Sequence, residues 1–164
     1  MTTASENFPG TTTLTISAAS LASDANLVAG RASASVDNSS NLDIDHIVGG
    51  FLTTGTTPTA ARQIEVWVAP SVDGGSSNFA GGATGSDANL TPQEKTLMKL
   101  LTIIPTSSTS NQQYNFGPFS VAQACGGTMP QFYVIYIVQN TGANLHATAG
   151  NHVVKAQRVK YTSA

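Results

Sequence analysis

The segment RQIEVWVA, residues 62–69, is the clearest indicator of the fold. Two kinds of residue alternate along it, with Ile64, Val66 and Val68 in one phase and Glu65 and Trp67 in the other. Side chains of a β-strand point to its two faces in turn, so a period of two is typical of a half-buried strand. We therefore predict a strand here, with the isoleucine and valine side chains facing the core and the other two facing outward.

Other segments of the chain carry strand signatures of the same length. They cover residues 12–17, 41–54, 112–119 and 152–161. The segment QFYVIYIVQ, residues 131–139, is apolar at nearly every position, which predicts a strand covered on both of its faces. The sequence therefore contains about seven or eight strands once short connecting segments are counted.

Glycines and polar residues separate these strands. The pair Gly49-Gly50 predicts a bulge or bend inside the 41–54 segment. Residues 17–40 are rich in serine, alanine and asparagine and predict a loop with room for one short strand. Residues 70–89 contain five glycines and no periodic pattern, which predicts a long exposed loop.

Helical signals are confined to short pieces. Thr91-Pro92-Gln93-Glu94 combines a capping residue, a proline at the first helical position and a glutamate three residues after the cap, so we expect one or two helical turns there, followed by a strand that ends at Pro105. Ser120 predicts a second short turn that continues to Ala124. Strands without long intervening helices indicate an all-β fold, an antiparallel β-sandwich of jelly-roll-like form.

Length and cysteine content are those of one ordinary domain. A chain of 164 residues can bury about 70% of its extended surface in a single core. We expect residues 1–10 to form a flexible N-terminal arm and residues 11–164 to form the sandwich domain. Cys125 is the sole cysteine and has no partner for a disulfide or a metal site, so packing and hydrogen bonds must stabilise the fold.

The chain carries unusually few charges. Only 10% of its residues are Asp, Glu, Lys or Arg, against roughly 25% in typical globular domains, and the net charge is -2. Such a composition gives no reason to expect electrostatic attraction to nucleic acid or to acidic membranes. Burying hydrogen-bonded polar groups costs far less than burying unpaired ions. The composition therefore favours a surface that packs against other protein subunits.

Asp43, Asp45 and His46 form the closest approach to a chemical site in the sequence. Alternation along 41–54 places both carboxylates on one face of a strand and His46 on the other face, with Leu42 and Ile44. One strand then cannot direct all three groups at a single metal ion. The two aspartates could hold calcium only with several further oxygen ligands, so the pattern favours a solvated outer face and leaves the cation question open.

The other candidate reactive groups are the histidines. His46, His146 and His152 could each serve as a general base, but a catalytic triad also needs a positioned nucleophile and an acid that orients the base. The chain contains no G-x-S-x-G motif, and its many serines make chance pairings uninformative. We expect no enzymatic activity and no cofactor, and we interpret the histidines as polar residues at strand ends.

Neither the basic residues nor the N-terminus indicates a nucleic-acid or membrane role. Lys155, Arg158 and Lys160 are too few for a nucleic-acid site and suit the protection of an exposed sheet edge. No apolar stretch approaches the roughly 20 residues of a membrane helix. The opening MTTASENFPG lacks the pattern of a secretory signal, so we expect synthesis in the cytoplasm.

Four stretches together resemble a family of small virion structural proteins of tailed bacteriophages. They are LTISAASLASDANLVAGRASASVDNSSNLDI (14–44), RQIEVWVAPSVDG (62–74), YNFGPFSVAQACGG (114–127) and QFYVIYIVQNTGANLHATAGNHVVKAQRV (131–159). The resemblance lies in the order of strands and linking phrases and extends over most of the chain after residue 10. It implies a jelly-roll or sandwich subunit and supplies no catalytic residues.

The resemblance implies a capsid decoration, or cement, protein on the surface of the virion. Its expected partners are the major capsid protein and copies of itself, with a homotrimer favoured. We expect the interface to use the arm, the outward indole and the apolar 131–139 strand, namely Phe8, Trp67, Phe132, Tyr133 and Tyr136. For Trp67, cover by a neighbouring loop is an equal alternative, and a sugar-stacking role ranks behind both.

A tail- or fibre-associated module is the alternative role. Such a module would bind host glycans, through the glycine-rich 70–89 loop and exposed aromatic side chains, or another virion protein.

Overall fold

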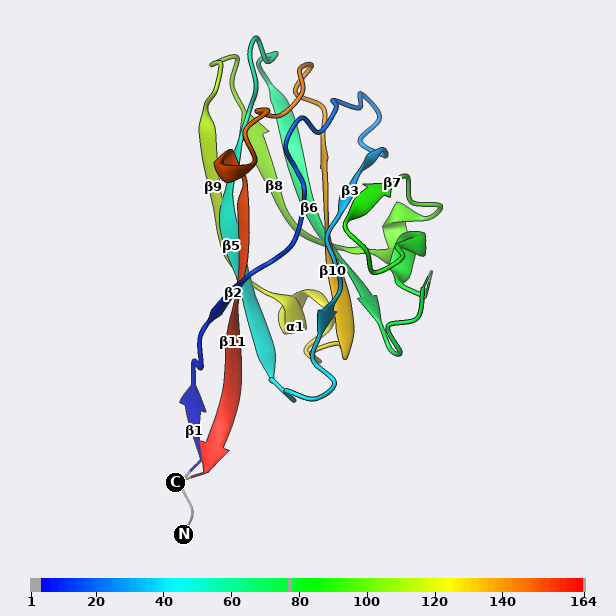
Figure 1. Cartoon of the computed structure of the whole chain (residues 1–164), viewed down its shortest axis with the longest axis vertical. Coiled ribbons are helices and arrows are strands. Elements are labelled where there is room, and N and C mark those ends of the chain that lie inside the picture. The colour runs from blue at the N-terminus through cyan, green and yellow to red at the C-terminus, as the bar shows by residue number, and fades with distance from the viewer. Residues whose placement is uncertain (1–3, 77, 164) are drawn as a thin grey trace.

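The computed structural model describes residues 4–76 and 78–163, which form two antiparallel sheets packed face to face (Figure 1). One sheet, called here the β10 sheet, has the order β7-β3-β10-β6-β8, and β4 also pairs with β10. Its strands are β3 (Gly30–Ala32), β4 (Val36–Asp37), β6 (Arg62–Ser71), β7 (Ala88–Leu90), β8 (Lys99–Thr106) and β10 (Phe132–Gln139). They include the predicted strand segments 62–69 and 131–139, as β6 and β10.

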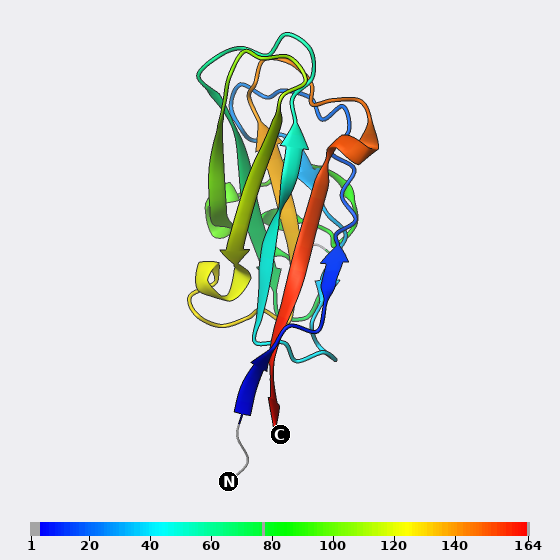
Figure 2. The ribbon, with the colours of Figure 1, turned by 90° about the vertical axis from the view of Figure 1, so that its left-hand side faces the viewer.

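The second sheet, called here the β11 sheet, has the order β1-β11-β5-β9, and β2 also pairs with β11. Its strands are β1 (Ala4–Asn7), β2 (Thr11–Thr13), β5 (Asp45–Thr53), β9 (Gln113–Ser120) and β11 (Val153–Ser163). The two layers are seen edge-on in Figure 1 and from the side of the β11 sheet in Figure 2. This arrangement confirms the predicted all-β antiparallel sandwich.

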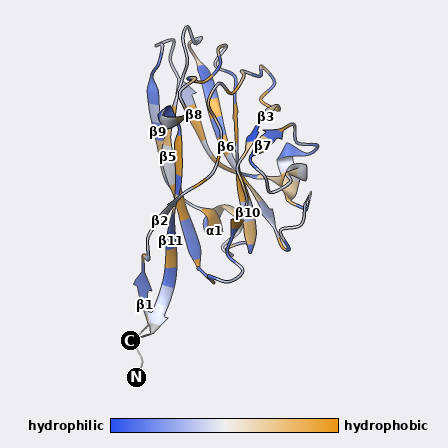
Figure 3. Ribbon diagram, viewed as in Figure 1, coloured by the Kyte–Doolittle hydropathy of each residue, from blue (hydrophilic) through white to orange (hydrophobic). Residues whose placement is uncertain are grey.

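The core lies between the two sheets. The inward residues of β6 are fully buried there, as the alternation in residues 62–69 predicts, and they meet the inner faces of β5, β10 and β11. The largest aliphatic members are Leu52, Ile64, Val66, Val68, Ile135, Ile137 and Leu145. In Figure 3 the hydrophobic colour follows β10, whereas β1 is largely hydrophilic.

The β10 sheet is covered on its outer face as well. Phe79, Ala83 and Met98 come from the segment after β6 and pack with Val134 and Tyr136 of β10. Phe79 is only 3% exposed, so the prediction of a long exposed loop at residues 70–89 is wrong around Phe79, although it holds for Val72, which is 84% exposed. Gly85 lets the backbone lie close to the Phe79 ring, because a side chain at this position would overlap the ring. A single aromatic residue among glycines has no period from which its burial could be predicted.

The described residues also contain three short helical elements besides α1 (Val121–Ala124). They are η1 (Ala80–Gly82), η2 (Lys95–Leu97) and η3 (Ala149–Asn151), all of them 3₁₀ turns. The helix expected to start at Thr91 is only η2, which begins four residues later and has no side-chain cap. By contrast, α1 (Val121–Ala124) follows the prediction, because the Ser120 Oγ accepts a hydrogen bond from the Gln123 amide at 2.9 Å.

One further departure from the prediction and one confirmation of it concern the strands. The 17–40 segment contains two short strands, β3 and β4, where the sequence predicts at most one. The predicted bulge is present, since the register between β5 and β9 shifts between Val48 and Gly50. A methyl group on Gly50 would overlap the Val153 carbonyl oxygen of the neighbouring strand, so only glycine fits at this crossing.

The N-terminal arm contains a strand that the sequence analysis did not predict. Residues 4–7 form β1 and pair with residues 160–163 at the end of β11. This two-stranded ribbon, called here the terminal ribbon, projects from one end of the sandwich (Figures 1 and 2). Among the described residues, every helix is too short or too polar to cross a lipid bilayer.

Candidate functional site

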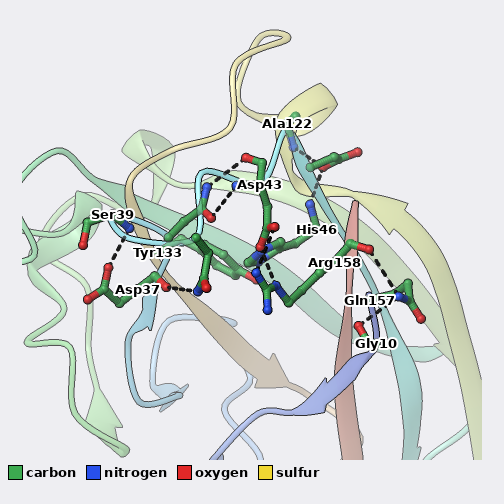
Figure 4. A network of polar contacts seen from close by, with 12 residues as sticks. Gly10, Asp37, Ser39, Asp43, His46, Ala122, Tyr133, Gln157 and Arg158 are labelled. Atoms are coloured by element: carbon green, nitrogen blue, oxygen red, sulfur yellow. Dashed lines mark hydrogen bonds and ion pairs between the residues drawn. The ribbon is translucent and has the colours of Figure 1, made fainter. Parts of the chain in front are cut away.

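A buried polar network brings together residues from three strands and one loop (Figure 4). Both carboxylate oxygens of Asp43 accept hydrogen bonds from Arg158, with Nε at 2.6 Å from Oδ2 and Nη2 at 3.1 Å from Oδ1. His46 Nε2 lies 3.0 Å from the same Oδ2, and His46 Nδ1 lies 2.8 Å from the Tyr133 hydroxyl. The network therefore connects β5 and β11 of one sheet with β10 of the other.

This network corrects the prediction that Asp43 and His46 point to opposite faces. Regular strand geometry begins only at Asp45, and Leu42 adopts a left-handed backbone conformation with φ of 51°. The Asn38 side chain bonds to both the N–H and the C=O of Asp43, which turns its carboxylate inward. Alternation cannot be extended through a turn, so Asp43 is buried while Leu42 is 76% exposed.

The charge state of Asp43 follows from two opposing influences. Burial is the largest single influence and raises the pKa of this carboxyl, but the hydrogen bonds and positive charge of Arg158, together with the bond from His46, outweigh it and leave the pKa below its ordinary value. Burial also raises the pKa of the Tyr133 hydroxyl. Asp43 is thus a carboxylate held between two donors, and Tyr133 is a neutral phenol.

The order Asp43, His46, Tyr133 resembles a catalytic relay in its connectivity. A relay needs its last member to reach a substrate. The Tyr133 side chain is fully buried in the core between the sheets, and among the described residues its hydroxyl bonds only His46. What the arrangement does chemically is to join the two layers through charge-assisted hydrogen bonds.

The two aspartates predicted to share a face do not form a cation site. The Asp45 Oδ1 accepts from the amides of His46 and Ala122, at 2.8 and 2.9 Å, and so holds the start of α1 against β5. Within residues 4–76 and 78–163, no three His, Cys, Asp or Glu side chains lie together in a way that could hold a metal ion.

The remaining histidines meet at the connection that precedes β11. His152 Nε2 lies 2.7 Å from the His146 carbonyl oxygen, and His152 Nδ1 is 3.4 Å from the Thr53 amide. His146 Nδ1 accepts from the Thr148 amide at 3.1 Å and lies 2.9 Å from the Asn151 side chain. His46 lies near the start of β5 and His152 contacts its end, so the structure does not bring the three histidines together.

Trp67 is on the outer face of β6, as predicted, but a neighbouring segment occupies it. The indole Nε1 donates to Glu65 Oε2 at 2.9 Å, and the Lys95 ammonium sits 4.8 Å from the ring centroid while bonding the same carboxylate at 2.6 Å. Glu65 is itself buried. Of the alternatives for Trp67, cover by a loop is therefore the one that the structure shows.

The five residues expected at an interface fall into different environments. Tyr133 and Tyr136 have no exposed surface, so their assignment to an interface is wrong. Strand β10 lies between the opposite sheet and the segment that contains Phe79, and the chain itself therefore supplies the cover that we assigned to a partner. Phe132 is half-buried against Gly74, whereas Phe8 is 58% exposed and free to make contacts.

Sequence reasoning missed an exposed apolar groove. It lies where β6 ends and β10 begins, has a volume of about 630 Å³, and is lined mainly by apolar side chains. The principal lining residues are Pro70, Val72, Ala80, Leu97, Met129 and Pro130. Val72 is 84% exposed and Leu97 is 58% exposed. Val72 belongs to no periodic segment, and Leu97 fits the helical spacing after Pro92, which did not indicate an exposed groove. We call this surface the apolar groove.

Ion pairing within the chain leaves the exterior still poorer in charge. Arg31, Lys95 and Arg158 pair with Asp87, Glu65 and Asp43, respectively. Six of the sixteen acidic and basic residues are thereby neutralised internally. The polar side chains that line the apolar groove are also uncharged, which favours contact with another macromolecule over the binding of an ion.

Comparison with known proteins yields no relative from which a role could be transferred: no family model, no curated protein and no solved structure matches this chain.

Proposed function

We propose that this chain is a structural protein of a tailed bacteriophage, a decoration subunit that binds and stabilises the assembled capsid. The observation that carries the proposal is the apolar groove in a sparsely charged surface, with Val72 84% exposed. An exposed apolar patch bordered by neutral polar groups is typical of protein interaction sites. The resemblance of residues 14–159 to small virion proteins is the reason for proposing a phage particle as the partner. The groove is the surface that we propose contacts it.

The terminal ribbon adds a second contact surface. It projects from the end of the sandwich at which β6 ends and β10 begins (Figure 1). Tyr161 in the ribbon is 59% exposed, and Phe8, in the link next to it, is 58% exposed. Aromatic side chains with polar edges are enriched at protein interfaces. We therefore assign the capsid-facing side of the subunit to the end that carries the groove and the ribbon, and the partners to the major capsid protein and further copies, with a trimer as the proposed oligomer.

Stabilisation of a capsid by such a subunit is a matter of linkage. A protein that binds only the assembled lattice lowers the free energy of that state, and the effect grows with the logarithm of its free concentration above Kd. Bridging contacts repeated over a shell add up without any single contact being strong. This mechanism needs a rigid body and a complementary surface, and it needs no reactive group.

Cosedimentation with assembled shells of the encoding phage tests the proposal. Val72→Asp and Leu97→Asp place a charge in the groove and should reduce binding at least tenfold, because an unpaired carboxylate would be desolvated at the interface. Leu42→Asp is the matched control, since Leu42 is 76% exposed on a different loop and should bind as the wild type does. Wild-type protein that fails to sediment with shells, or only a few copies on each purified particle, would remove the proposal.

The tail-associated alternative keeps weaker support. A glycan-binding role depends on an aromatic stacking surface, and the face of Trp67 is occupied by Lys95 while its N–H bonds Glu65. Binding of the wild-type protein to a glycan array, lost in Trp67→Ala, would favour the alternative over capsid decoration.

A further inference from the structure

The terminal ribbon is held together by little beyond its own backbone pairing. Four residue pairs join its strands, from Ala4 opposite Ser163 to Asn7 opposite Lys160. Residues 4–6 are exposed, and among the side chains that the structure describes, one bond crosses the ribbon, the 3.5 Å contact between the Ser5 and Thr162 hydroxyls. Two strands paired in isolation are marginally stable at best in water. β1 is therefore weakly held in its present place.

Strand β11 extends past its pairing with both β2 and β5 before it reaches the ribbon. Its pairing with β5 ends at Val159, opposite Asp45. From residue 160 onward, β1 is the strand that pairs with it. At this end of the sheet, residues 160–163 thus have their strand partner from the opposite terminus of the chain. A strand of the same sequence from another copy could take the same position.

The link between β1 and the rest of the protein is short and contains a glycine that can act as a hinge. Residues 8–10, Phe-Pro-Gly, connect the rung at Asn7 with the rung at Thr11, which pairs with Gln157. All three link residues are exposed, and Gly10 has a φ of 143°, a conformation that other residues rarely adopt. A rotation at this glycine would swing β1 away from its own β11 without disturbing the core.

We propose that β1 is an exchangeable arm that, in the assembled state, leaves its own chain and pairs with residues 160–163 of β11 in a neighbouring copy. This inference rests on the proposed function, because it needs a second copy held nearby. The exchanged rungs are chemically identical to those within one chain, so the exchange itself costs little, and the local concentration in an assembly decides which pairing prevails. Arms that cross between copies would tie neighbouring subunits together.

The exposed aromatic side chains give the exchange a net gain. Phe8 lies in the hinge and Tyr161 lies in the ribbon, opposite Glu6, and each is more than half exposed in the single chain. An arm that crosses to a neighbour carries Phe8 to the boundary between the two copies, where both sides can cover it. Burial of apolar area is favourable, so the covered surface favours the crossed arrangement.

Disulfide trapping with two single-cysteine chains tests this directly. Ser5→Cys and Thr162→Cys, each combined with Cys125→Ser, place thiols on facing residues of β1 and β11, and a mass tag on one chain identifies mixed dimers. The two chains are mixed, allowed to assemble on capsid shells or at high concentration, and oxidised. Gly150→Cys replaces Thr162→Cys in the control, because a side chain at Gly150 meets open space.

Arm exchange predicts a mixed-mass disulfide dimer from the Ser5→Cys and Thr162→Cys chains and at least a tenfold lower yield with the Gly150→Cys chain. The double variant with both cysteines should form covalent oligomers when assembled and an internal disulfide when dilute. An internal disulfide under all conditions, with no mixed dimer, would overturn the inference. Cosedimentation of the wild-type protein measures capsid binding independently of arm exchange. Absence of the mixed dimer would therefore contradict arm exchange and leave capsid binding untouched. If the protein does not bind shells, disulfide trapping in concentrated solution still tests arm exchange.

Discussion

At the scale of single residues, several of the few charged side chains form ion pairs within the chain. Asp43 has a fully buried side chain whose two oxygens are both bonded, and its partner Arg158 keeps 28% of its side chain exposed. A buried ion pair adds little stability over a well-packed apolar group. Removal of one partner, however, leaves the other charge buried and unpaired, where water cannot solvate it. The network is therefore more sensitive to half-removal than an exposed ion pair would be.

Arg158→Met should lower the free energy of unfolding by about 2 to 3 kcal/mol, because Asp43 then stays buried with only His46 as a charged or polar side-chain partner. Lys155→Met is the matched control on the same strand, since Lys155 is exposed and has no ion-pair partner among the described residues. Its effect should stay within about 0.5 kcal/mol. Urea titration followed by tryptophan fluorescence measures both, and equal effects of the two variants would contradict the expectation.

The free energy of unfolding should also decrease as the pH falls, over a range set by the pKa of His152. Burial is the main cause that lowers the pKa of His152, and the nearby His146 lowers it further, although the bond to the His146 carbonyl acts in the opposite direction. The Nε2–H donates to that carbonyl, so a proton added at Nδ1 would face the Thr53 N–H. The unfolded chain then binds more protons than the folded chain below a pH of about 6.5, and stability declines as the pH falls from there toward the lowered pKa.

Unfolding free energies measured at pH 7.5 and pH 5 test this prediction. The wild type should lose stability between the two values, and His152→Gln should show a clearly smaller loss. A second decline is expected below a pH of about 4, where Asp43 and Asp87, whose pKa values are lowered, take up protons. An unchanged profile in His152→Gln between pH 7.5 and pH 5 would show that other groups govern that window.

At the scale of elements, the segment after β6 acts as a third layer. It brings Phe79 and Met98 onto the outer face of β10 and ties its far end to the sheet through Lys95 and Glu65. This cover explains how β10 can be apolar on both faces without a partner subunit. The strand pattern in residues 131–139 is therefore satisfied within one chain.

Phe79→Ala should destabilise the protein by roughly 3 kcal/mol or more, because it opens a cavity above a fully buried strand. Val72→Ala is the control in the same segment, since Val72 is 84% exposed and its truncation should change stability by less than about 0.5 kcal/mol. Thermal unfolding of the two variants compares them directly. If the segment were the exposed loop that the sequence predicts, the two substitutions would have the same small effect.

At the scale of the whole molecule, the sparse charge should govern how the protein associates. Its net charge is -2, and the ion pairs formed within the chain remove further charge from contact with other molecules. Charged partners attract one another over distances that salt shortens, whereas contacts between apolar and neutral polar surfaces are little screened. Assembly of this protein should therefore depend on shape and apolar contact more than on charge.

We accordingly expect its affinity for capsid shells to change by less than about threefold between 50 and 500 mM sodium chloride, because few screened charges take part. Cosedimentation at the two salt concentrations measures the change. A loss of binding of tenfold or more at the higher salt concentration would indicate that charged groups dominate the contact. Such a result would contradict the assignment of the interface to the apolar groove.

The sequence by itself determined the all-β class, the β6 strand with its inward isoleucine and valines, the bulge at Gly50 and the turn capped by Ser120. Each of these depends on neighbours within a few residues, and a period or a capping side chain reports them directly. Only the tertiary structure decided which residues from distant segments meet. The Asp43–His46–Tyr133–Arg158 network, the cover over β10 and the apolar groove each join segments far apart in the chain, and such contacts arise from packing that no local pattern encodes.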